Sequence, residues 1–183
     1  NLTASGARGG GFLTAYPCGQ QRPDTSTVNY RAVEARPNNV IVRLGAGAQV
    51  CVYSYAEADV IIDVTGYFAL TGLGYIPTSP TRLADTRQGR VQPPRPAGTM
   101  LSYAVGAPPA ATVESAFVNI TAVDHPRTGF VTTYDCAAIP DTSTVNQIPG
   151  EANANGANVR VPTCAWLSDA GHLIVDLNGW WVR

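Results

Sequence analysis

The chain has 183 residues, of which 45% are hydrophobic and 14% are charged, a composition typical of a folded rather than a disordered protein. Its 13 acidic and 12 basic residues nearly balance, which argues against a nucleic-acid-binding protein with a basic face. All the basic residues are arginine, so lysine-dependent chemistry such as a Schiff base or a P-loop is excluded. The uncharged segments are interrupted by Gly, Pro and Thr before they reach the ~20 apolar residues of a membrane span.

Short apolar runs separated by Gly, Pro, Asn and Asp predict β-strands along the whole chain, with helix nearly absent. In the first part of the chain we expect strands at residues 12–16, 27–30, 39–44, 49–53 and 60–68. Farther along we expect strands at residues 81–86, 100–105, 116–122, 129–134, 144–147, 158–161, 164–167 and 173–181, with a loop at Pro93, Pro94 and Pro96. This density of short strands predicts an all-β fold, an antiparallel β-sandwich of the Ig-like or jelly-roll-like kind.

An internal repeat shows that the chain contains tandem duplicated modules. The run GFLTAYPC at residues 11–18 recurs as GFVTTYDC at residues 129–136, and both copies contain DTSTVN, at residues 24–29 and 141–146. Near the end of each copy, DVIIDVTGYF at residues 59–68 aligns without a gap with HLIVDLNGWW at residues 172–181. Residues 74–118 occur once, between the two copies.

This pattern predicts the domain organisation. Residues 1–69 form the C-terminal portion of a first β-module, residues 70–74 a linker, and residues 75–183 a complete second β-module. If the unrepeated segment opens the second module, the first module lacks its own opener and needs strands from preceding residues or from another chain. The alternative is that residues 74–118 pack across both copies to make one closed domain.

Residues 75–87 read YIPTSPTRLADTR. This run resembles the opening Tyr-x-Pro-x-x-Pro-x-Arg-Leu-x-Asp-Thr-Arg of secreted bacterial modules, mainly actinobacterial and often in tandem. Those modules typically continue through Phe-x-Thr-x-Tyr-x-Cys to a second Cys and end in Asp-x-x-Gly-Tyr-Phe, where this chain has Trp180 and Trp181. The resemblance implies a secreted or cell-surface protein of the kind found beside wall-active enzymes, and it implies no activity for the module itself.

The four cysteines occupy equivalent positions in the two copies. We therefore expect one disulfide per module, Cys18 with Cys51 and Cys136 with Cys164, which is the connectivity that respects the repeat. The alternative, a metal site made by all four thiolates, is disfavoured because zinc ligands usually come in closely spaced Cys-x-x-Cys pairs.

Charged residues in otherwise apolar strands are the first candidate site residues. Arg82, Asp85 and Arg87 form either a site for a polar or anionic ligand or a structural ion pair, and strand alternation predicts Arg82 on the face opposite the other two. Asp63 and Asp176 occupy the same place in both copies and need a partner, which is a structural hydrogen bond, a calcium ion or a sugar. Acid catalysis is disfavoured, because one carboxylate per module is half of a glycosidase pair.

Aromatic residues are the second group of candidates. Trp180 and Trp181, together with Trp166, offer a surface on which a saccharide could stack, because neighbouring residues of a strand point to opposite faces. The alternative is ordinary packing in the core or at a sheet edge. The two histidines, His125 and His172, have no repeated surroundings, and we expect both to lie on the surface.

These features predict an extracellular structural or adhesive β-sandwich repeat module of a secreted or cell-surface protein, one that assembles by strand complementation into a fibre. The alternative is a carbohydrate-binding module attached to a secreted wall- or polysaccharide-active enzyme. We expect no catalytic residues, metal or cofactor. The expected partners are neighbouring modules, other copies of the chain or cell-wall polysaccharide, with no nucleic acid and no membrane insertion.

Overall fold

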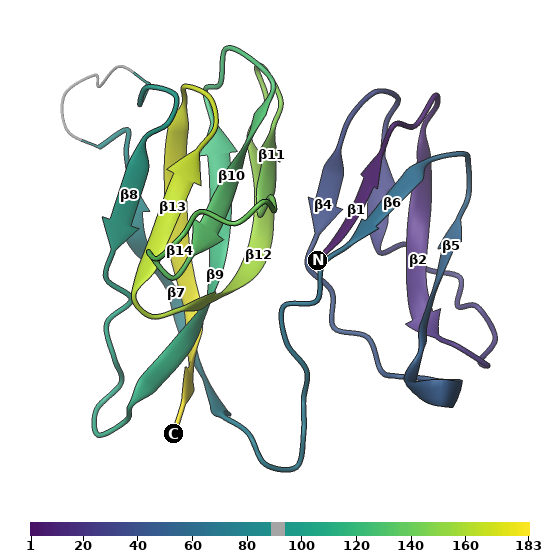
Figure 1. Ribbon diagram of the computed structural model, residues 1–183, viewed down its shortest axis with the longest axis horizontal. Helices are drawn as coiled ribbons and strands as arrows, with labels where there is room; N and C mark the ends of the chain where they lie inside the picture. Colours follow the sequence, from purple (N-terminus) through teal and green to yellow (C-terminus); the bar gives the residue numbers. More distant parts are fainter. Residues whose placement is uncertain (89–93) are drawn as a thin grey trace. The chain divides into compact units, whose positions relative to one another are not determined.

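Figure 1 shows the computed structural model, which describes residues 1–88 and 94–183. As predicted, the protein is all-β with antiparallel sheets, and the described residues form fourteen strands and one short 3-10 turn, η1 (Ala46–Ala48). The chain divides into two compact units, Asn1–Asp63 (unit 1) and Val64–Arg183 (unit 2). None of the helical structure in the described residues is long and apolar enough to cross a membrane.

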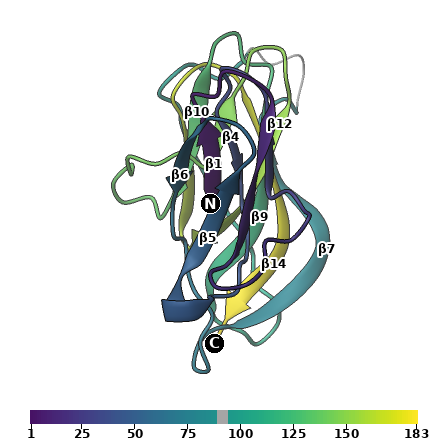
Figure 2. The same cartoon turned by 90° about the vertical axis from the view of Figure 1, so that its right-hand side faces the viewer.

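Unit 2 is a sandwich of two four-stranded sheets. One sheet has the order β12 (Asn153–Arg160), β9 (Val113–Val123), β14 (His172–Val182), β7 (Gly74–Asp85). The other has the order β11 (Val145–Gln147), β10 (Gly129–Tyr134), β13 (Thr163–Leu167), β8 (Met100–Tyr103). Figure 2 shows β7 beside β14, and their register runs from Ile174 opposite Asp85 to Val182 opposite Gly74.

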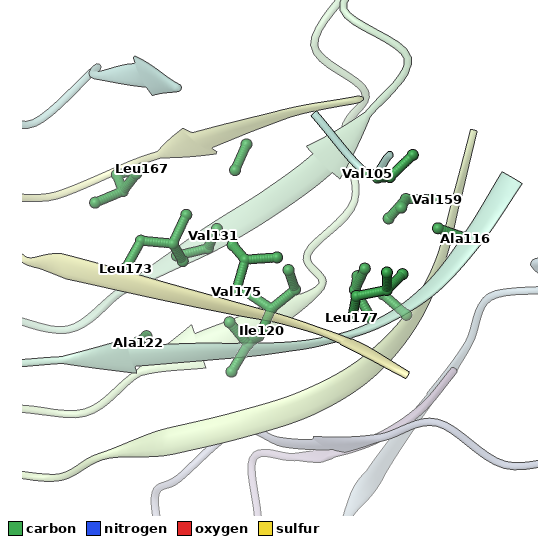
Figure 3. Packing of buried hydrophobic residues seen from close by; sticks show 14 residues of the cluster. Val105, Ala116, Ile120, Ala122, Val131, Val159, Leu167, Leu173, Val175 and Leu177 are labelled. Atoms are coloured by element: carbon green, nitrogen blue, oxygen red, sulfur yellow. The ribbon is translucent and has the colours of Figure 1, made fainter. Parts of the chain in front are cut away.

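The core of unit 2 follows from the alternation of its strands. Every second residue of β9 from Ala116 to Ala122 is fully buried, as expected for strands with one face toward a second sheet. Figure 3 shows this cluster, to which β14 contributes Leu173, Val175 and Leu177.

Unit 1 repeats this arrangement with fewer strands. One sheet has the order β4 (Arg36–Asn38), β1 (Leu2–Ser5), β6 (Asp59–Ile62), and the other has the order β3 (Val28–Tyr30), β2 (Gly11–Pro17), β5 (Val50–Ser54). Its buried cluster is correspondingly small and consists of Leu2, Ala4, Ala7, Leu13, Val28 and Tyr30.

The repeat extends to individual hydrogen bonds. The Asn38 side-chain amide donates to the carbonyl of Thr27 at 2.7 Å, and Asn155 donates to the carbonyl of Thr144 at the same distance. In both copies the DTSTVN segment also binds the neighbouring strand, because the hydroxyl of its second threonine accepts the N–H of Ala15 or Thr133. The repeated residues therefore stabilise the same loop in each unit.

The predicted disulfides are confirmed. Cys18 binds Cys51, Cys136 binds Cys164, and the described residues contain no free cysteine. Each bridge joins the residues just after the strand that contains GF-x-T, β2 or β10, to the neighbouring strand of the same sheet, β5 or β13, so each unit carries its own cross-link.

Several strand boundaries differ from the prediction. Residues 39–44 do not form the expected strand; β4 lies just before them and ends at Asn38, whose side chain binds the Thr27 carbonyl. β1 was not predicted. β7 begins at Gly74 despite Pro77 and Pro80, which an outer strand tolerates because one row of its N–H groups has no partner strand. The expected strand at residues 60–68 ends at Ile62. Of the expected loop, Pro93 lies outside the described residues.

Candidate functional site

The main candidate site is the pair of incompletely paired strands in unit 1, β6 and β5. In unit 2, β14 lies between β9 and β7, and β13 lies between β10 and β8. Their counterparts by the repeat are β6 and β5, which within residues 1–88 and 94–183 pair only with β1 and β2 respectively. Unit 1 therefore lacks the counterparts of β7 and β8, and each of its sheets ends at a strand that is internal in unit 2.

Side-chain exposure shows the effect of this difference. Val60, Ile61 and Ile62 of β6 are 39%, 49% and 60% exposed, whereas the aligned residues 173–175 of β14 are at most 7% exposed. Exposed apolar residues continue past the end of β6 with Val64, Tyr67 and Phe68. Exposed apolar side chains along a strand with an open edge, as in β6, usually mark an interaction site.

The sequence of β6 is that of an internal strand. Val60, Ile61 and Ile62 form an unbroken apolar run, as in strands that are covered on both faces. Natural outer strands instead carry proline or charge that prevents further pairing, and β7 of unit 2 has Pro77, Pro80 and Arg82. Between Asp59 and Asp63, the open edge of β6 therefore has neither proline nor charge, whereas the outer strand of unit 2 has both within its length.

In unit 2, β7 and β8 complete both the core and the hydrogen bonding. Leu83 and Ala84 of β7, with Leu101 and Tyr103 of β8, pack against the buried cluster. Just after β7, Thr86 accepts the N–H of Leu173 at 2.9 Å through its hydroxyl, which also lies 3.0 Å from Nδ1 of His172. These contacts show what a strand at the edge of β6 would supply to unit 1.

Charged residues anchor β7 to β14. Arg82 pairs with Asp176 through Nε and binds Oδ2 of Asp85 through Nη1 at 2.8 Å. Arg87 binds both carboxylate oxygens of Asp85, at 2.9 and 2.8 Å, and its backbone N–H donates to Oδ1 at 3.0 Å. These hydrogen bonds from Arg87 lower the pKa of Asp85 to about 2.

The grouping of these charges corrects one expectation. Simple alternation predicted Arg82 on the face of the sheet opposite Asp85. In the structure, the Arg82 guanidinium donates a hydrogen bond to the Asp85 carboxylate, so the two side chains lie on the same face. The register shifts between Val175 and Asp176, so that Ala84 and Arg82 lie opposite consecutive residues of β14. Such a bulge inserts a residue and moves every preceding side chain to the other face of the sheet.

Asp63 of unit 1 occupies the place of Asp176 but has a different partner. Its carboxylate accepts a hydrogen bond from the side-chain amide of Asn1 at 3.3 Å. Within the part of the chain that the structure describes, no arginine forms an ion pair with Asp63. The carboxylate thus lies at the open edge beside the N-terminal ammonium group of Asn1, which donates to the Asp63 carbonyl at 2.8 Å, rather than beside an arginine.

The three tryptophans are half-buried, and each lies in an aromatic or polar contact. Trp180 packs against the core and donates its indole N–H to the carbonyl of Val105 at 3.0 Å. Trp181 donates to Oδ1 of Asn158 at 2.8 Å, and its ring lies 4.7 Å from that of Tyr75 and 5.5 Å from that of Phe68. Trp166, in a different sheet, lies 5.6 Å from the ring of Phe130.

The histidines are not on the surface as expected. His125 and His172 are 3% and 4% exposed. Nδ1 of His125 lies 2.8 Å from the carbonyl oxygen of Ala170, and burial lowers the pKa of its imidazole. In the described residues no group of three or more His, Cys, Asp or Glu side chains could hold a metal ion.

Sequence reasoning predicted that unit 1 lacks an opener, but it did not name Val60, Ile61 and Ile62 as exposed residues. The alignment of residues 59–68 with 172–181 contained that signal, because it pairs them with residues of a central strand. No protein-family model matches the chain, and no curated protein or solved structure shows significant similarity to it.

Proposed function

We propose that the chain is an extracellular structural repeat module in which unit 1 is completed by added β-strands. The observation that carries this proposal is the open edge of β6, an apolar strand with the sequence of an internal one. Strand addition would satisfy its free backbone groups and cover its side chains in one step. Strand addition between molecules joins two different surfaces, so it is a heterologous contact. When it is repeated from molecule to molecule it builds an open fibre, except where the rotation between neighbours closes a ring.

Two further observations support an extracellular structural role. Each unit has its own disulfide, and disulfides persist mainly in oxidising compartments outside the cytosol. Arg82 joins Asp85 to Asp176 of β14, and Arg87 binds Asp85 within the same segment, which favours a structural role over a ligand site for these residues.

Hydrogen exchange combined with sedimentation of the 183-residue chain tests the proposal. In the free chain, we expect the amides of residues 59–62 to exchange at least about tenfold faster than those of residues 172–175, because only the latter have strands on both sides. In assemblies, the same amides should become protected. A compact monomer whose residues 1–63 are as well protected as unit 2 would overturn the proposal.

Carbohydrate binding is a second candidate, favoured by the aromatic cluster of Trp181, Tyr75 and Phe68. Tyr75 and Phe68 are exposed, so the cluster offers ring faces to which the apolar face of a sugar can stack. A glycan array with the chain and its Trp181→Ala variant tests this. Loss of binding in the variant supports the candidate, and binding that survives both Trp180→Ala and Trp181→Ala contradicts it.

A further inference from the structure

We propose that the strand accepted by β6 is a polypeptide segment of the same type as β7, with an arginine that pairs with Asp63 and a leucine next to it that enters the core of unit 1. This inference rests on the proposed function and names the partner of the same site. The donor lies outside residues 1–183, because β7 is already paired with β14. The register and the charges of β6 indicate what kind of strand it is.

The register follows from the repeat. Asp176 aligns with Asp63, an offset of 113 (176 − 63), and Arg82 lies opposite Asp176 in the pairing of β14 with β7. The same offset places the donor's counterpart of Arg82 opposite Asp63 and that of Ala84 opposite Ile62.

The chemistry of the acceptor fits that register at two polar positions. Asp63 provides a carboxylate at the open edge for the arginine, as Asp176 does for Arg82. Asp59 aligns with His172, the residue whose ring contacts the hydroxyl of Thr86, and a carboxylate there accepts a hydrogen bond from a threonine hydroxyl. Charge and hydrogen-bonding capacity thus match a β7-type donor.

The apolar positions match as well. In unit 2, Leu83 and Ala84 pack against the core beside residues 173–175. In unit 1 the aligned Val60, Ile61 and Ile62 are present but exposed, so apolar area is available for the donor's leucine. A second strand of the β8 type has a place beside β5, where Val50 is 40% exposed.

The donor is not β7 of this chain or of a second copy. Here β7 pairs with β14 along its length and is held by Arg82, by Tyr75, whose hydroxyl donates to the carbonyl of Asn178 at 3.1 Å, and by contacts of Thr86. If β7 moved to β6, β14 would lose its outer neighbour and unit 2 would have the open edge instead. Exchange of β7 between copies would therefore complete one unit only by opening another. An additional segment is required.

A synthetic peptide with the sequence of residues 74–88 is the probe. Added to the full chain, it should bind with one-to-one stoichiometry, measured by calorimetry, and should slow the hydrogen exchange of residues 59–63 while residues 172–182 stay unchanged. The matched peptides carry Arg82→Glu, which removes the pair with Asp63, or Arg87→Glu, which makes the same charge change at a residue whose partner lies within the peptide. We expect about tenfold weaker binding for the first and a smaller loss for the second.

Charge exchange tests the register. The chain variant Asp63→Arg should bind the parent peptide about tenfold more weakly and recover binding to the Arg82→Asp peptide, whereas Asp24→Arg, at an exposed site in unit 1, should change binding little. Absence of peptide binding, or protection confined to residues 172–182, would overturn the β7-type donor. Association of the chain alone through a protected β6 would also overturn it, while leaving strand addition, and hence the proposed function, intact.

Discussion

Asp85 anchors the outer strand of unit 2, although its side chain is only 4% exposed and carries a charge. Such burial is tolerated because two arginines and a backbone N–H bind the carboxylate. The side chains of Arg82 and Arg87 are each about two-fifths exposed to solvent. The cluster therefore pairs a buried carboxylate with two guanidinium groups that remain hydrated. Removal of the carboxylate alone leaves both guanidinium groups near the strand end without their shared partner.

Acid should therefore weaken unit 2 through Asp85. Its pKa in the folded chain, about 2, lies below the ordinary 3.8, so its contribution is fully present above the ordinary value and is lost as the pH falls toward about 2. We expect the free energy of unfolding of unit 2 to fall over this range more steeply in the parent than in Asp85→Asn, as measured by denaturant titration. At neutral pH the variant should lose about 2 kcal/mol. Parallel pH profiles for the two proteins would contradict this role.

At the scale of elements, β6 and β14 place one sequence pattern in two environments. Ile61 and Ile174 align, yet the first is exposed at a free edge and the second is buried between strands. Local sequence is thus nearly the same in both copies, and the difference in burial comes from the presence or absence of β7.

The same pair makes a direct test of the open edge. Ile61→Lys should change the thermal stability of the free chain by no more than about 0.5 kcal/mol, because the side chain is already exposed. Ile174→Lys should cost about 3 kcal/mol, because Ile174 is only 7% exposed between β9 and β7 and a charge there loses its hydration. Similar losses for both would show that β6 is covered in solution. In a mixture with a donor, Ile61→Lys should in addition reduce strand addition.

Much of the fold follows from local pattern, because strands, turns and the repeat are all encoded at short range. Alternation along residues 116–122 and the equivalence of the cysteines suffice to predict the sandwich and its two disulfides. The bulge beside Arg82 and the burial of His125 depend on contacts with strands distant in sequence, which alternation does not report. The alignment of the two copies pairs the exposed residues of β6 with residues of a central strand. That they are exposed could be seen only once the neighbours of each strand were known.

At the scale of the whole molecule, the two units differ in how much core supports them. Six buried residues form the cluster of unit 1, against fourteen in unit 2, although each unit has one disulfide. Small domains rely on cross-links when burial contributes little. Unit 1 therefore depends on its disulfide more than unit 2 does.

Removing the disulfides one at a time should show this asymmetry. The bridges span 33 and 28 residues, so each contributes about 3–4 kcal/mol by restricting the unfolded chain. We expect the double variant Cys18→Ser with Cys51→Ser to unfold unit 1 at room temperature, whereas Cys136→Ser with Cys164→Ser leaves unit 2 folded with a lower melting temperature. Hydrogen exchange resolved by residue distinguishes the two, and an unfolded unit 2 beside a folded unit 1 would contradict the expectation.

The likeness of β6 and β14 also affects how the chain reaches its final pairing. Residues 63–73 alone separate β6 from β7, whereas β14 begins at His172, so during synthesis β7 emerges beside β6 several seconds before β14 exists. Closing a short loop is fast, and closing a long one is slow. Folding should therefore involve a competition between two acceptors for one strand, in which chain proximity favours β6 early and the contacts of Arg82 with Asp176 and of Tyr75 with Trp181 favour β14 at equilibrium.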